Sequence, residues 1–484
     1  MAGFAARLAR MRPLSYRVKK GLELFMKKHV IHLLQIATSL AVALVVAGCG
    51  GSAGTSPGPT PTPTPTPTAG IQSINHIIFM YQENRSFDHY FGDLNNYRVS
   101  QGLPASVDVA PAGITNVLRD GSGPFARFHF NDKCSDSLSP FWNESHNSFN
   151  LTDPTSATGT MDGFATTAGQ FAIDTLENDV AGKRAMGYYT SADLPFYYFM
   201  ATQFATSDRW FSPVMNRTQL NRIFGLGGTN AGFIYPPGTA ADNDPTPFPS
   251  TVKNIFQLLD DAHITWRVYS AAGSEDLVGL AAHTYLSYFQ PFASQHAANI
   301  VARTQFLTDV QNGTLPQVAL IEPDGNDEHP NTELEVGAAE VAGLMNALMA
   351  SSSWKDSAFI FTYDEGGDFY DHVPPQPAVL PDNVPPRFLQ TFDVRATYDH
   401  TGFRVPLIIV SPFAKKNFVS HTVMDYTAIL KFIETRFNLP ALSARDAAQP
   451  NMTEFFDFAN PPWLTPPTGV PTQPQVGPCT FLIP

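Results

Sequence analysis

Four polar clusters in this chain of 484 residues carry side chains that could do chemistry. They are "YQENRSFDHYFG" from Tyr81, "NRTQLNR" from Asn216, "EPDGNDEHP" from Glu322 and "TYDEGGDFYDHVPP" from Thr362. The first contributes Glu83 and Asn84, and the last contributes Asp364 and Glu365. Brought together, these carboxylates and the amide carbonyl would form a site for one divalent metal ion, and such oxygen ligands suit Ca²⁺, Mg²⁺, Mn²⁺ or iron alike.

Each of these two pairs also has an ordinary structural explanation. Glu83 and Asn84 could cap the N-terminus of a helix. Asp364 and Glu365 could form an acidic turn after a strand. Both pairs, however, follow apolar runs of strand length, and parallel strands end at the same edge of a sheet. This coincidence favours a metal site over two unrelated local structures.

A hydroxyl, Thr218, lies in the second cluster between Arg217 and the pair Asn221 and Arg222. A hydroxyl becomes a nucleophile when a base removes its proton or a metal lowers its pKa. A neighbouring guanidinium or amide can then hold an anionic oxygen of the substrate. Thr beside Arg is also common on protein surfaces, so this cluster alone indicates little.

Three histidines lie in polar segments beside acids or prolines, namely His146, His329 and His372. In such surroundings an imidazole can be both accessible and oriented for proton transfer. A single histidine more often has a structural role, and that alternative stays open for each of them.

The elements that must position these residues are apolar runs that stop at polar clusters. Four such runs are "INHIIFMYQ" (Ile74 to Gln82), "QVALIEP" (Gln317 to Pro323), "SAFIFTY" (Ser357 to Tyr363) and "VPLIIVSP" (Val405 to Pro412). Uninterrupted apolar strands are typical of a sheet that is buried on both faces. We therefore expect a mostly parallel sheet, with all the polar clusters, including "FAKKN" after Pro412, beyond the carboxyl ends of the strands.

Helical segments lie between these strands and after the last of them. The segment from Asn331 to Ala350 is rich in Ala, Leu and Val, and the segment from Tyr426 to Phe437 has one apolar face. Strands alternating with helices predict an α/β fold, a three-layer α/β/α sandwich.

The charge of the chain excludes one class of partner. The formal net charge is −13, with 43 acidic and 30 basic residues. Such a surface repels polyanions, so we predict no nucleic-acid partner.

The N-terminus predicts an exported protein. Lys27 and Lys28 precede an apolar run that ends at Ala47 and is followed by a cysteine, Cys49, in the order of a secretion signal. The stretch "LVVAGC" resembles a bacterial lipobox, which makes residues 1–48 a lipoprotein signal peptide and Cys49 the lipidated residue. A plain transmembrane anchor is the alternative, and Met26 could be the true start.

The remaining domain boundaries follow composition. Residues 49–70 contain a Pro/Thr repeat that predicts an extended linker. We expect a catalytic domain over residues 71–460 and a Pro-rich tail over residues 461–484. In an oxidising compartment Cys134 and Cys479 could form one disulfide, although nothing in the sequence shows that they meet.

Several motifs together resemble a known family. "HIIFMYQENRSFDHYFG", "MDGF", "TQLNR", "NDEHP", "TYDEGGDFYDHV" and "GFRVPLIIVSP" are similar, in order and spacing, to motifs of the bacterial phosphoesterase family that joins phosphatidylcholine-cleaving phospholipases C to AcpA-type acid phosphatases. The resemblance runs from about Ile74 to Asp446. It implies an alkaline-phosphatase-like fold.

The resemblance also implies roles for individual residues. Metal ligands are Glu83, Asn84, Asp364 and Glu365; Thr218 is the nucleophile; His146 and His329 lie around the phosphate and the leaving group; Asn221, Arg222 and His372 bind substrate. We interpret Arg85, Asp88 and His89 as the scaffold of the first ligand pair.

The sequence departs from the family pattern at three positions. Leu220 replaces a proline before "NR". Gln290 in "FQPFA" replaces a histidine, with His283 and His296 nearby as substitutes. Tyr426 in "MDYTA" also replaces a histidine, which leaves the identity of the general acid open.

These residues predict a secreted or surface-anchored hydrolase of phosphoric esters, with a phosphate-ester substrate and a membrane contact through the lipid anchor. Thr218 would form a covalent phospho-threonine, and His329 would protonate the leaving alcohol. A phospholipase C and an acid phosphatase are the two enzymatic alternatives. A non-catalytic, surface-anchored binding protein on the same fold is the alternative from another class.

Overall fold

A large mixed sheet forms the centre of the computed structural model, which describes residues 70–238, 244–273, 284–475, 477 and 479–481. Within these residues the sheet has eight strands in the order β13-β6-β12-β11-β1-β10-β8-β9. Their bounds are Phe418–Ser420, Ala205–Ser207, Leu407–Val410, Ser357–Tyr363, His76–Gln82, Val318–Ile321, Trp266–Ser270 and Ile300–Ala302. The predicted signal peptide, Cys49 and nearly all of the predicted linker lie outside the described residues.

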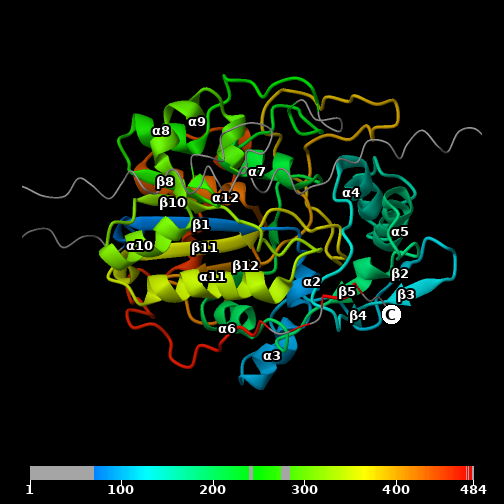
Figure 1. Cartoon of the computed structure of the whole chain (residues 1–484), viewed down its shortest axis with the longest axis horizontal. Coiled ribbons are helices and arrows are strands. Elements are labelled where there is room, and N and C mark those ends of the chain that lie inside the picture. Colours follow the sequence, from blue (N-terminus) through cyan, green and yellow to red (C-terminus); the bar gives the residue numbers. More distant parts are fainter. Residues whose placement is uncertain (1–69, 239–243, 274–283, 476, 478, 482–484) are drawn as a thin grey trace, which may run out of the picture. The chain divides into compact units, whose positions relative to one another are not determined.

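Helices cover both faces of this sheet (Figure 1). On one face lie α6 (Pro195–Gln203), α10 (Thr304–Asn312) and α11 (Leu334–Met349). On the other lie α7 (Thr218–Gly227), α8 (Ile255–Asp261), α9 (Phe292–Gln295) and α12 (Thr427–Phe437). The three-layer α/β/α class predicted from the sequence is therefore confirmed. No helix of the described segments is long and apolar enough to span a bilayer.

The sheet is mostly parallel, as predicted, because β1 pairs in parallel with both β10 and β11, and β10 with β8. The strand β12 is the exception and runs antiparallel to both β11 and β6. The expectation that "FAKKN" after Pro412 lies at the same edge as the other polar clusters is therefore wrong. An apolar run that is buried on both faces does not specify its own direction.

The remaining elements lie outside the eight-stranded sheet. Their helices are α2 (Phe87–Phe91), α3 (Leu94–Ser100), α4 (Trp142–Phe149), α5 (Phe164–Thr175) and α13 (Ala444–Ala447). Short strand pairs are β2 (Thr115–Val117) with β3 (Pro124–Ala126), β4 (Phe128–His129) with β5 (Gly187–Tyr188), and β7 (Trp210–Phe211) with β14 (Met424–Asp425). Single 3₁₀ turns span Ile71–Ser73, Lys183–Met186, Tyr285–Tyr288, Ala297–Asn299, Trp354–Asp356 and Thr453–Phe455.

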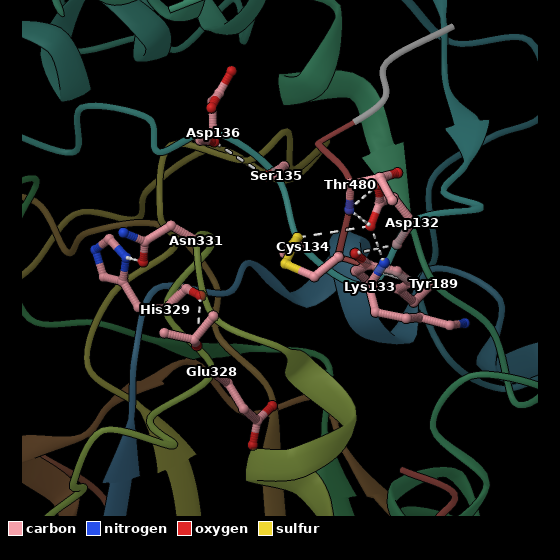
Figure 2. The surroundings of a disulfide bond; sticks show 12 residues. Asp132, Lys133, Cys134, Ser135, Asp136, Tyr189, Glu328, His329, Asn331 and Thr480 are labelled. Atoms are coloured by element: carbon pink, nitrogen blue, oxygen red, sulfur yellow. Dashed lines mark hydrogen bonds between the residues drawn. A yellow bond between two sulfur atoms is a disulfide. The ribbon is translucent and has the colours of Figure 1, made fainter. Parts of the chain in front are cut away.

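The described part of the tail after residue 461 packs along the body of the protein. The indole of Trp354 donates a hydrogen bond of 2.8 Å to the carbonyl of Trp463. A disulfide joins Cys134 to Cys479, whose Cα atoms lie 5.3 Å apart (Figure 2). Next to it, the amide of Ser135 donates to the carbonyl of Pro330 over 2.7 Å. The disulfide therefore braces the segment that contains His329.

Candidate active site

Two strand ends deliver the four predicted metal ligands. In the parallel pair of β1 and β11, the last residues Gln82 and Tyr363 lie opposite each other. The chain then continues from both strands at the same edge of the sheet. The amide of Asn84 donates to Oδ1 of Asp364 over 3.0 Å. The two ligand pairs are thus brought together, as the sequence predicts.

The turns after these strands approach each other closely. Asn84 has a φ of +63°, a left-handed conformation that asparagine adopts more readily than most residues. A Cβ on Gly367, whose φ is +67°, would lie 2.2 Å from the carbonyl oxygen of Asn84. The alternative that Glu83 and Asn84 cap a helix is wrong, since Ser86 is the N-cap of α2.

Thr218 is the first residue of α7, where the helix dipole and the free amides favour an anionic ligand. Its side chain is almost buried, with 8% of its surface exposed. The hydroxyl Oγ1 lies 3.1 Å from Oε2 of Glu83 and 3.2 Å from Oδ1 of Asn84. The predicted nucleophile thus touches the predicted metal ligands.

Arg222 lies one helical turn after Thr218 and reaches both carboxylate segments. Its Nη2 donates to Oε1 of Glu83 over 2.9 Å, and its Nε donates to Oδ2 of Asp364 over 3.3 Å. The third nitrogen, Nη1, is buried without a hydrogen-bond partner among the described residues. A buried donor of this kind can satisfy an oxygen of an anionic ligand.

We call Glu83, Asn84, Asp364, Glu365, Thr218 and Arg222 the nucleophile cluster. Burial and the charge of Asp364 raise the pKa of both Glu83 and Glu365 well above the usual range, although Arg222 opposes the rise at Glu83. Oε1 of Glu365 is buried and has no hydrogen-bond partner within the described part of the chain. Three buried carboxylates, an amide oxygen and an unsatisfied oxygen fit a divalent cation, which would balance the excess negative charge.

A second group of acidic residues lies nearby along the chain. Asp88, Asp371 and His372 are, in the described segments, the one set of three or more His, Cys, Asp or Glu side chains whose ligand atoms all lie within 4.8 Å of one another. By spacing they could hold a metal ion. Arg404, however, already pairs with Asp371 over 2.8 Å and with Asp88 over 3.1 Å. We call these four residues the Arg404 cluster.

His372, predicted to bind substrate, belongs to this cluster. Its Nδ1 lies 2.6 Å from Oδ2 of Asp88, and its Nε2 lies 3.1 Å from Oδ1 of Asp108. Burial lowers the pKa of His372, but the hydrogen bond and the charge of Asp88 outweigh burial and raise it. Both nitrogens are therefore engaged by carboxylates.

His146 lies on α4 and is 2% exposed. Its Nδ1 is 2.6 Å from the carbonyl of Trp142, and its Nε2 is buried with no partner among the residues described. Burial lowers the pKa of His146 to about 4, so the ring is neutral at pH 7. A neutral ring that donates from Nδ1 leaves Nε2 as an acceptor rather than an acid.

His329 is half-buried on the segment after β10. Its Nδ1 lies 2.8 Å from Oδ1 of Asn331. The same segment contacts the nucleophile cluster, because the amide of Glu83 donates to the carbonyl of Asp327 over 2.9 Å. His329 is thus carried by a loop that is bonded to a predicted metal ligand.

Asn221, also predicted to bind substrate, uses its side chain within the loop before α7. Its Nδ2 donates to the carbonyl of Asn216 over 2.6 Å, and its Oδ1 accepts from the amide of Val214 over 3.1 Å. The amide therefore shapes the approach to Thr218.

The positions that depart from the family pattern have different surroundings. Gln290 is exposed and bonds to Ser287 and Ser294. His296 stacks on Phe292, 3.2 Å from Asp260. His283 lies outside the described residues.

Tyr426, by contrast, is fully buried beside the nucleophile cluster. Its hydroxyl donates to the carbonyl of Asp364 over 3.0 Å. It therefore supports the backbone that carries the second ligand pair.

Two residues of the site were not predicted from the sequence. Tyr285 lies with its ring 4.6 Å from the guanidinium of Arg222 and its hydroxyl 3.4 Å from Oε1 of Glu83. The charge of Asp327 also raises the pKa of Glu83, to a smaller extent than burial and Asp364 do, while Arg222 lowers it. Asp327 stands in the "NDEHP" motif, so its proximity to His329 in sequence was a usable signal, whereas Tyr285 offered none.

The sequence of the chain also matches a known protein family. The family described as "Phosphoesterase family" matches residues 74–440, more than half of the chain. The chain belongs to the phosphoesterase family. It is therefore a hydrolase of phosphoric ester bonds, as the motifs predicted. A non-catalytic binding protein is correspondingly disfavoured.

Relatives within the phosphoesterase family include phospholipases C. Phospholipase C B of Mycobacterium tuberculosis is 30% identical over 440 residues, which cover 81% of this chain and 79% of that protein. Hemolytic phospholipase C of Pseudomonas aeruginosa is 29% identical over 448 residues, 80% of this chain and 56% of that protein. Non-specific phospholipase C4 of Arabidopsis thaliana is 28% identical over 410 residues, 78% of this chain and 71% of that protein.

Solved structures are more distant. A protein of the alkaline phosphatase superfamily from Vibrio parahaemolyticus covers 74% of this chain and 78% of its own, with 10% identity and a TM-score of 0.32.

Proposed function

We propose that this phosphoesterase cleaves phospholipid head groups in the manner of a phospholipase C, with Thr218 as the nucleophile. One observation carries the proposal. The hydroxyl of Thr218, at the N-terminus of α7, lies within 3.2 Å of both Glu83 and Asn84. The phospholipase C relatives support the substrate class.

The chain's own residues supply most of the reaction. Oγ1 of Thr218 releases its proton to water and attacks phosphorus, and a bond to phosphorus forms as the bond to the leaving alcohol breaks. Arg222 holds a phosphoryl oxygen through Nη1, and the first turn of α7 faces the developing negative charge. Water then hydrolyses the phospho-threonine and releases the phosphorylated head group.

A divalent cation held by Glu83, Asn84, Asp364 and Glu365 would lower the pKa of the threonine hydroxyl and screen the phosphoryl charge. We assign proton donation to the leaving alcohol to His329. His146, with its depressed pKa near 4, is neutral at pH 7 and suits an acceptor role instead.

The proposal includes an exported location. Residues 1–48 would be removed, Cys49 lipidated, and residues 71–460 held away from the membrane by the Pro/Thr linker. Replacing Cys49 with Ser should then move the enzyme from the membrane fraction to the soluble exported fraction. An unchanged distribution would contradict the lipid anchor.

The chemical test compares two chromogenic substrates. The wild type should release p-nitrophenol from p-nitrophenylphosphorylcholine faster than from p-nitrophenyl phosphate, and chelator should abolish the release. Thr218→Ala should lower turnover by about 10⁴-fold or more, while Thr218→Ser retains much of it. Thr206, a buried threonine of β6 that bonds to the carbonyl of Leu407, provides the matched control, Thr206→Ala.

Each other outcome has a defined meaning. Preference for p-nitrophenyl phosphate would favour an acid phosphatase. Wild-type turnover by Thr218→Ala would refute the nucleophile, and no release from either substrate would favour a binding protein.

A further inference from the structure

Glu328 is a fully buried carboxylate directly before His329. Each of its two oxygens accepts two hydrogen bonds. The donors are the hydroxyl of Tyr197 (2.5 Å) and Nε2 of Gln82 (3.2 Å) on Oε1, and the hydroxyls of Tyr363 (2.8 Å) and Tyr90 (2.9 Å) on Oε2. Four donors around one carboxylate match the hydrogen-bonding capacity of an anion.

Two of these donors occupy special positions. Gln82 is the last residue of β1, immediately before Glu83, and Tyr363 is the last residue of β11, immediately before Asp364. Successive side chains of a strand point to opposite faces, so each donor turns away from the ligand that follows it. The carboxylate of Glu328 thus ties together the two strand ends that present the predicted metal ligands.

The backbone of the Glu328 segment also accepts hydrogen bonds. One donor is Arg85, which directly follows the first ligand pair in the sequence. The guanidinium of Arg85 donates to the carbonyl of Glu328 from Nε (2.8 Å) and Nη2 (2.5 Å). The amide of Glu83 donates to the carbonyl of Asp327 (2.9 Å). Arg85, interpreted from the sequence as scaffold, therefore has a specific partner in the backbone of Glu328.

Glu328 adopts a backbone conformation that residues other than glycine rarely adopt. Its φ is +66°, in the left-handed region that glutamate rarely occupies, and such strain persists only where the surroundings impose it. On the facing helix α11, a Cβ at Gly337 would lie 2.4 Å from Cγ of Glu328. A glycine on α11 therefore leaves the space that the Glu328 side chain needs.

We propose that Glu328 is a positioning residue, whose carboxylate fixes the two ligand-bearing strand ends and the His329 segment in one arrangement. This inference rests on the proposed function of the nucleophile cluster. Figure 2 shows the side chains of Glu328 and His329 leaving the chain in different directions, so one residue anchors the segment while the next is left for chemistry.

Glu328 does not itself act on the substrate. Its side chain is buried, and each of its oxygens already has two donors. Burial raises the pKa of the three tyrosines well above the usual range, so they stay protonated and keep donating across the working pH range.

The test is Glu328→Gln, which keeps the shape but replaces one acceptor oxygen by an amide NH₂ group that cannot accept hydrogen bonds from the tyrosine hydroxyls. Mutation of a residue that orients metal ligands typically lowers metal affinity or activity by about 10- to 100-fold. We expect kcat for p-nitrophenylphosphorylcholine to fall by about that factor, with KM changed less than threefold and a weaker affinity for Mn²⁺ in chelator competition.

Glu434→Gln is the matched control, because Glu434 is a buried glutamate of α12, 3% exposed, whose charged neighbours are Asp446 and Lys431 rather than members of the nucleophile cluster. Its kcat should stay within about twofold of wild type even where its urea midpoint falls. If Glu328→Gln loses no more kcat than this control, the positioning role is refuted.

A second pair of variants covers the case in which Glu328→Gln does not fold. Tyr197→Phe removes one donor to Glu328, and Tyr269→Phe removes a comparable buried hydroxyl that donates to Asp309 over 2.7 Å. Only Tyr197→Phe should lower kcat, by about three- to tenfold for one lost hydrogen bond. An equal effect of both variants would overturn the proposal.

The proposed function can fail separately. Wild-type turnover by Thr218→Ala would refute the nucleophile whatever Glu328→Gln does. Inactive Thr218→Ala together with unaffected Glu328→Gln would leave the function standing and refute the positioning role alone.

Discussion

The nucleophile cluster and the Arg404 cluster share the two chain segments that follow β1 and β11, and each contains a buried arginine from a different segment, but they differ in how their charges are balanced. In the Arg404 cluster all four carboxylate oxygens of Asp88 and Asp371 accept hydrogen bonds from Arg404, His372 or backbone amides. In the nucleophile cluster one oxygen of Glu365 and one nitrogen of Arg222 have no partner among the described residues.

The electrostatics follow this difference at Asp88, although burial raises the pKa of Asp371. Although burial alone would raise it, the charge of Arg404 and the hydrogen bond from His372 hold the pKa of Asp88 at about 2. Burial and neighbouring carboxylates raise the pKa of Glu83 and Glu365 instead. A cluster whose partners are complete stabilises the fold, whereas one with unsatisfied buried groups is prepared for a ligand.

The largest expected effect is at the centre of the Arg404 cluster. Arg404→Met would leave Asp88 and Asp371 buried without their cation. We expect a loss of about 3–5 kcal/mol in the free energy of unfolding, measured by urea titration at pH 7. A loss under about 1 kcal/mol would mean that the cluster is not a structural ion network.

Metal binding should distinguish the two clusters next. Adding Mn²⁺, Mg²⁺ or Ca²⁺ to chelator-treated protein should raise the free energy of unfolding by about 2.7 kcal/mol at a hundredfold excess over Kd. The gain should shrink as the pH falls, because protons compete for carboxylates whose pKa values are raised.

The variants Glu365→Gln and Asp371→Asn locate that metal response. Glu365→Gln should weaken it and Asp371→Asn should not. The reverse result would move the metal to the Arg404 cluster.

The pH dependence of stability should report on Asp88. Because its pKa is lowered on folding from 3.8 to about 2, its contribution is complete above about pH 5 and disappears as the pH falls toward 2. This contribution is about 2 kcal/mol. The difference in urea stability between wild type and Asp88→Asn should therefore shrink between pH 5 and pH 2, and a constant difference would contradict the depressed pKa.

The smallest expected effect is at the edge of the nucleophile cluster. Tyr285→Phe removes a hydroxyl 3.4 Å from Glu83 but keeps the ring over Arg222. We expect kcat/KM to fall about fivefold, or about 1 kcal/mol, with unchanged stability in urea. A change in stability without a change in kcat/KM would assign Tyr285 to the fold rather than to the site.

Much of the fold could be read from local pattern. The run from Ile74 to Gln82 predicts a buried strand, and the structure has β1 at His76–Gln82 with six of its residues buried. The segment from Asn331 to Ala350 predicts a helix, which the structure has at Leu334–Met349. Both features depend on periodicity within one segment, which the sequence contains in full.

Strand direction was not readable in this way. The apolar pattern of "VPLIIVSP" is the same whether the strand runs parallel or antiparallel to its neighbours. Only the path of the chain between β11 and β12 makes the pairing antiparallel.

By itself the sequence determined the α/β class, the family, and the residue types at the ends of β1 and β11. Tertiary structure alone decided which polar groups find partners. His372 is engaged by Asp88, Arg222 keeps one donor without a partner in the described part of the chain, and Glu328 accepts hydrogen bonds from four donors. The physical reason is that hydrogen-bond satisfaction of a buried group depends on residues hundreds of positions away, which no local pattern records.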